Sequence, residues 1–223
     1  AENGHITGVY PVLPEQYAGA PVEDYGDDLI VQSFVDLHLH APQYPMLGMG
    51  MDLPLLDWLN AYAFPTEARF ADPDYARAVY RRLARELIAG GTTRVCMFSS
   101  LHRPATVILM EELERAGITG YVGKVNMDRN ALPGVLEETA EESMRETLQW
   151  LEESAAFRHV KPMLTPRFIP SCSDEVLSFL GKLAAERNLP IQSHLSENQA
   201  EMEWVRQLHP DCKQYWEAYA KFG

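Results

Sequence analysis

The stretch FVDLHLHAPQ, residues 34–43, begins as an apolar strand pattern and ends in two histidines and a glutamine. Successive side chains of a strand point to opposite faces, so His38 and His40 share one face. The preceding residues LIVQS are also largely apolar, and the pattern predicts one strand over residues 29–40. Side chains that can bind a ligand or take part in catalysis, when they lie at the end of a buried strand, are typical of a site at the carboxyl edge of a parallel sheet.

Further apolar runs alternate with segments of helical periodicity. Strands buried on both faces are predicted at residues 29–40, 92–100, 120–128, 160–168 and 189–197. Helices are predicted at residues 72–91, with an Asp cap and a Gly stop, and at 137–153 and 173–188. This alternation predicts right-handed βαβ crossovers and a parallel α/β sheet, either open or closed into a barrel.

Two features favour a TIM-like (β/α)₈ barrel. Polar residues end several strands, in HLH, SSLH, NMD, TPRF and SHLSE, where such barrels carry their sites. No GxGxxG or P-loop motif follows any predicted strand, which argues against the open-sheet folds that bind nucleotides. Residues 29–223 hold about five strand–helix units whereas a full barrel has eight, so we expect part of a longer protein. Residues 1–28 are too few for a domain alone and predict a preceding strand or two.

Composition excludes several classes of function. Nineteen Lys and Arg against 32 Asp and Glu give a net charge of −13 without any basic cluster, which argues against nucleic-acid binding. No apolar run approaches the roughly 20 residues that span a bilayer, so no membrane association is expected. Cys96, Cys172 and Cys212 fit neither a disulfide framework nor a metal knuckle. A reducing, cytoplasmic location is therefore predicted.

Three histidines are candidate metal ligands. His38 and His40 can bind one cation such as Zn²⁺, although the HxH pattern alone is equally compatible with two hydrogen-bonded core histidines. His194 also ends a predicted strand, where a third ligand could approach the same point. The third histidine favours the metal site over the structural alternative.

Other polar residues near these strand ends are candidates for chemistry. Glu197 could carry protons next to a metal-bound water, or could instead stabilise the start of the following helix. Arg167 offers a rigid donor fork to a substrate oxygen, or could form a structural salt bridge, and Phe168 could cover a planar ring. His102 and Asp128 are predicted only to line the pocket.

Several of these motifs together resemble the guanine deaminase family of the amidohydrolase superfamily, from about residue 29 to the last residue. They are FVDLHLHAPQ, DLPLLDWLNAYAFPTEARF, GGTT, GKVNMD, VKPMLTPRF and IQSHLSEN. The HxH pattern alone indicates only the superfamily, whereas APQ, TPRF and SHLSEN restrict the resemblance to the guanine deaminases. The resemblance implies one zinc ion per subunit bound by His38, His40 and His194. It also implies guanine binding by Gln43 and Arg167 with Phe168 alongside, and proton transfer by Glu197.

The implied reaction is the hydrolytic deamination of guanine to xanthine and ammonia, a step of purine catabolism, with zinc-bound hydroxide as nucleophile. The family resemblance also implies a homodimer.

The sequence departs from the family pattern in two places: Gln32 and Ser33 replace a usual Pro-Gly, and a later metal-site His and Asp are absent from these 223 residues. We therefore expect residues 1–28 to belong to a small β-sandwich completed by other sequence, residues 29–223 to form a partial barrel, and this chain alone to be inactive. The alternatives are a deaminase of another purine, a pterin or a triazine, and a non-catalytic binding fragment.

Overall fold

The computed structural model describes residues 1–3 and 5–223, which divide into two units, Ala1–Gln32 and Ser33–Gly223. The first unit holds a 3₁₀ turn at Glu15–Tyr17 and an isolated bridge between Glu2 and His5. Apart from this bridge, its described residues form no strand, in contrast to the one or two strands predicted there. A strand needs a paired neighbour for its backbone N–H and carbonyl groups. Membership of a β-sandwich domain stays a prediction.

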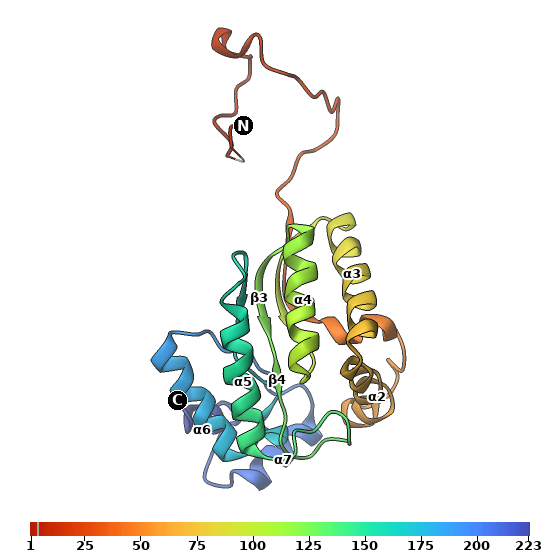
Figure 1. Cartoon of the computed structure of the whole chain (residues 1–223), viewed down its shortest axis with the longest axis vertical. Helices are drawn as coiled ribbons and strands as arrows, with labels where there is room; N and C mark the ends of the chain where they lie inside the picture. Colours follow the sequence, from red (N-terminus) through yellow and green to blue (C-terminus); the bar gives the residue numbers. More distant parts are fainter. Residues whose placement is uncertain (4) are drawn as a thin grey trace. The chain divides into compact units, whose positions relative to one another are not determined.

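The second unit is an α/β fold built on parallel strands, as predicted (Figure 1). The main sheet has the order β1-β2-β3-β5, formed by Phe34–His40, Thr92–Phe98, Thr119–Gly123 and Val160–Pro162. Two short strands, β4 (Val125–Asn126) and β6 (Thr165–Pro166), pair in parallel next to it. The described strands form an open sheet and not a closed barrel.

The longer helices follow the strands in the predicted alternation. They are α3 (Pro73–Ala89), α4 (Arg103–Ala116), α5 (Ala140–Ser154) and α6 (Asp174–Arg187). The predicted helices at 72–91, 137–153 and 173–188 are thus confirmed, and the Asp72 carboxylate accepts hydrogen bonds from the Asp74 and Tyr75 amides at the start of α3. The shorter helices are α1 (Leu55–Trp58), α2 (Phe64–Ala68), α7 (Gln199–Leu208) and α8 (Tyr215–Ala220). No helix in the described part of the chain is both long and apolar enough to cross a membrane.

The strand at residues 29–40 is shorter and more exposed than predicted. β1 begins at Phe34, and Val35 and Leu37 are 53% and 70% exposed. The reason is that β1 has only one neighbour, β2, among the described strands. An apolar run predicts a buried strand only when elements cover both of its faces.

Of the remaining strand predictions, the one at 92–100 is confirmed by β2, and the other three change. The runs 120–128 and 160–168 each split in two, and between β3 and β4 lies Lys124, a buried cation that pairs with the buried Glu137. Residues 189–197 form no strand beyond a bridge between Ile191 and Leu164. After that bridge, Ser193 Oγ donates to the carbonyl groups of Pro166 and Arg167, so side-chain bonds replace a regular ladder.

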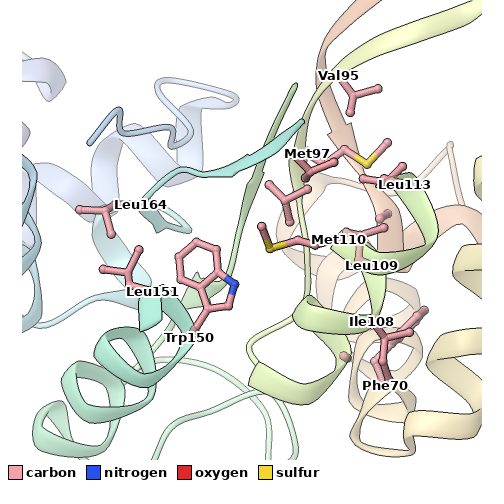
Figure 2. Packing of buried hydrophobic residues seen from close by; sticks show 14 of the residues in the cluster. Phe70, Val95, Met97, Ile108, Leu109, Met110, Leu113, Trp150, Leu151 and Leu164 are labelled. Atoms are coloured by element: carbon pink, nitrogen blue, oxygen red, sulfur yellow. The ribbon is translucent and has the colours of Figure 1, made fainter. Parts of the chain in front are cut away.

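The apolar core lies between the helices and the sheet (Figure 2). Leu109, Met110 and Leu113 of α4 pack near Met97 of β2, and all four are fully buried. Trp150 of α5 is also fully buried in this cluster. Because core packing fixes the strands, it also fixes the residues at their carboxyl ends.

The end of α4 is joined to the start of β5 by one carboxylate. Glu114 accepts backbone N–H bonds from Arg158, His159 and Val160, at 2.9–3.3 Å. Burial opposes ionisation, but these three bonds outweigh it and lower the pKa of Glu114 below 4.5. The ionised carboxylate therefore stabilises the connection that positions β5.

Replacing this residue, Glu114→Gln, is expected to lower the free energy of unfolding by about 1–2 kcal/mol at neutral pH, because amide N–H groups lose a charged acceptor. Since the folded-state pKa lies below the unfolded value, the stabilisation is complete above pH 4.5 and disappears as the pH falls through the lowered pKa. Urea unfolding at several pH values measures both effects. Glu111→Gln is the control, since Glu111 forms a half-exposed ion pair with Arg77. An equal loss in both variants, or a difference that persists in acid, would contradict this account.

Candidate metal and substrate site

Three histidines converge at the carboxyl ends of the strands. β1 presents His38 and His40 on one face, and His194 follows the bridge at Ile191. One ring nitrogen of each histidine lies within 4.8 Å of the corresponding atoms of the other two, and His40 Nε2 is 2.9 Å from His194 Nε2. The structure thus brings together the three predicted ligands.

Hydrogen bonding fixes the tautomer of His194. Its Nδ1 lies 2.6 Å from the backbone carbonyl oxygen of Arg167, which can only accept, so Nδ1 carries the proton. Nε2 is then the unprotonated nitrogen, and it accepts a hydrogen bond from His40 Nε2 at 2.9 Å. This is the usual support of a metal-binding imidazole, in which the second nitrogen donates to a carbonyl group.

The surroundings favour neutral imidazoles. Burial, followed by the charge of Arg167, lowers the pKa of His40 well below 6.5. Burial likewise lowers the pKa of His194 to about 4, although its bond to the Arg167 carbonyl group acts in the opposite direction. Phe98 is fully buried and stacks on His40, with ring centroids 4.4 Å apart. Neutral, aromatic-backed imidazoles are suited to a borderline-soft cation.

The seven residues predicted to bind metal, bind substrate or transfer protons line one cavity of about 140 Å³. Its walls are His38, His40, Gln43, Leu55, Trp58, Leu59, Arg167, Phe168, His194 and Glu197. His102 and Asp128 do not line this cavity; Asp128 instead accepts a hydrogen bond from the Ser173 amide. Metal-ligand candidates and ring-binding candidates therefore face a common space, while their individual roles stay predictions.

Glu197 lines the cavity, and its side chain does not form the cap of the helix that follows. The side chain of Asn198 caps α7, and the Glu201 carboxylate accepts the backbone N–H groups of Glu197 and Asn198. Partial burial raises the pKa of Glu197, against the opposing effects of His38 and Arg167. Other residues therefore form the cap, and both roles considered for this carboxylate, proton transfer and stabilisation of the helix start, stay predictions.

The polar side chains opposite the histidines form a network that includes an unpredicted residue. Arg167 is 3% exposed and both of its terminal nitrogens donate to the Glu67 carboxylate, which is also 3% exposed. Gln43 donates to the same carboxylate. Glu67 lies in FPTEARF, a stretch that carries the family resemblance, but no spacing rule connects it to Arg167. The available signal was the need of any buried arginine for an anionic partner.

The fold and this cavity define a partial (β/α)₈ barrel with its site at the carboxyl ends of the strands. Residues 29–223 match the model of the Amidohydrolase family. The chain belongs to the amidohydrolase family.

Known relatives of the chain include guanine deaminases. The protein of Rattus norvegicus is 44% identical over 196 residues, which cover 87% of this chain and 43% of that protein. The protein of Escherichia coli (strain K12) is 36% identical over 203 residues, or 91% of this chain and 46% of that protein. A crystal structure of guanine deaminase from C. acetobutylicum with bound guanine in the active site has a TM-score of 0.91 and 46% identity, and covers 95% of this chain and 51% of that chain. This chain thus spans about half the length of the relatives it matches.

Proposed function

We propose that the protein containing this chain is a zinc-dependent guanine deaminase, which converts guanine and water to xanthine and ammonia. The main support for the proposal is that three imidazoles, Glu197, Gln43 and Arg167 all line one cavity. The similarity to guanine deaminases, including one with bound guanine, supports this choice of substrate.

The donor set fits zinc. His38, His40 and His194 would hold the ion, since their nitrogens converge and Nε2 of His194 is unprotonated. When bound, zinc acts as a Lewis acid that lowers the pKa of a water molecule toward neutrality. One ion per subunit is proposed because the described residues form one such cluster.

The chain's own residues bind the ring and move protons. Gln43 and Arg167 hold the polar edge of guanine, and Phe168 covers its apolar face. Glu197 accepts a proton from the attacking water and delivers it to the departing nitrogen. In the balanced reaction a carbon–oxygen bond forms, the carbon–nitrogen bond at the same carbon breaks, and ammonia leaves.

The proposal is tested with the full-length, zinc-loaded protein and a panel of amino-substituted rings. Guanine should give equal amounts of xanthine and ammonia, whereas adenine, a pterin and an aminotriazine should react far more slowly. Turnover of one of those rings with none of guanine would overturn the substrate assignment while leaving the class of deaminases in place.

We further propose that the 223-residue chain alone binds zinc weakly and is inactive, because the family resemblance implies a later His and Asp that it lacks. Zinc content and xanthine production of this chain test the point. Robust turnover by these residues alone would contradict it. We also propose that the full-length protein is a cytoplasmic homodimer, which its molar mass in solution and cell fractionation would check.

A further inference from the structure

One buried carboxylate contacts both side chains that are proposed to hold the ring. Glu67 of α2 accepts from Gln43 Nε2 and from Arg167 Nη2 through the same oxygen, each at 3.0 Å. Its second oxygen accepts from Arg167 Nη1. A single side chain thus joins the segment after β1, the helix α2 and the end of β6.

We propose that Glu67 is the positioning residue of the substrate site, which sets the hydrogen-bonding polarity of Gln43 and neutralises the charge of Arg167. The inference rests on the proposed function, because it concerns the ring-binding side of the same cavity. Glu67 is absent from the residues that line the cavity, so it acts through its two partners.

The polarity of Gln43 follows from its contact with an anion. An amide presents a donor at one end and an acceptor at the other, and an ionised carboxylate can only accept. Glu67 therefore holds the NH₂ group of Gln43, and the Gln43 oxygen remains available as an acceptor for a ring N–H. Without Glu67 the amide could rotate and present either end to the ligand.

The neutralisation of Arg167 follows from the paired geometry. Each terminal nitrogen uses one N–H on Glu67, which leaves Nε–H and one N–H on each terminal nitrogen for a ligand. An unpaired buried guanidinium would attract anions, whereas the ion pair favours a neutral acceptor such as a carbonyl group. The pair of residues is thus matched to a neutral ring that carries an N–H beside a carbonyl group.

This pairing predicts how the site distinguishes two similar rings. Guanine has the N1–H and the C6 carbonyl group side by side, whereas 2-aminopurine lacks both and keeps the amino group at C2. In the full-length, zinc-loaded protein, Glu67→Gln should raise the KM for guanine about 10- to 100-fold. It should also lower the selectivity for guanine over 2-aminopurine by at least about 10-fold, with a smaller change in kcat and with zinc content unchanged.

The matched control is Glu112→Gln. Glu112 is also 3% exposed and is also bound by arginines, Arg77, Arg81 and Arg115, but it lies on α4 away from the cavity. Both variants should lose stability, and only Glu67→Gln should change KM and selectivity. A KM within about threefold of wild type for Glu67→Gln, or an equal change in both variants, overturns the proposal.

A second substitution tests whether Glu67 acts through Gln43. In a Gln43→Ala background, Glu67→Gln should raise KM less than it does in the wild type, since one of its two partners is already removed. Full additivity would show that Glu67 does not act through Gln43. If the wild type deaminates a different ring, the proposed function fails, and the same comparisons on that ring still test Glu67. If guanine is the substrate and the variants match wild type, only the role of Glu67 fails.

Discussion

Glu197→Gln is expected to lower kcat for guanine about 100- to 10,000-fold in the full-length, zinc-loaded protein, because the amide keeps the shape of the carboxylate but cannot take a proton. The fold should tolerate the change, since Asn198 and Glu201 form the cap of α7 without the Glu197 side chain. Steady-state release of ammonia measures the effect, with zinc content and melting temperature recorded for the same samples.

Glu203→Gln provides the control for this experiment. Glu203 lies on the adjacent helix α7, is exposed and pairs with Arg206 on the surface. We expect its kcat to match the wild type. Should Glu197→Gln retain more than a tenth of wild-type kcat with full zinc content, the proton-transfer role would have to be assigned to another group.

Removal of a metal ligand is expected to have an effect at least as large. His194→Ala should reduce bound zinc well below one ion per chain and activity by about 1,000-fold or more, because metal-assisted stabilisation of developing charge contributes several kcal/mol. Metal analysis of the purified full-length variant gives the first readout and ammonia release the second. Chelation of the wild type should reproduce the loss of activity, and added zinc should restore it in the wild type but not in the variant.

His159→Ala is the corresponding control, because His159 is exposed and lies outside the cavity. It should retain zinc and activity. Full zinc content in His194→Ala would show that His38 and His40 hold the ion with ligands other than His194, and would remove the three-histidine site from the proposal.

Much of the fold was predictable because its signals are local. The run from Asp72 to Gly91 contains a cap, a periodic apolar face and a glycine stop, and α3 forms within it. His38 and His40 could be placed on one face from the two-residue period of a strand. His194 could be added because residues 189–197 were expected to end at the same rim as the other strands, although only a bridge at Ile191 forms there.

The features that were missed depend on partners distant in the sequence. The exposure of β1 follows from having one neighbour, which its own apolar run does not reveal. Glu67 meets Arg167 across 100 residues, so only the folded chain places them in contact. Phe98 was not predicted as the support for His40, since an apolar residue at the end of a strand reads simply as core.

The bond that sets the tautomer of His194 involves the main-chain carbonyl group of Arg167, while the same residue also lines the cavity. Any amino acid at position 167 supplies that carbonyl group. Under the proposed function, a substitution there changes the side chain that contacts the ring and keeps the carbonyl group that accepts from His194 Nδ1. The proposed function therefore makes a change of substrate and the retention of the metal separable at this residue, in evolution or in design, whereas it couples them at the histidines.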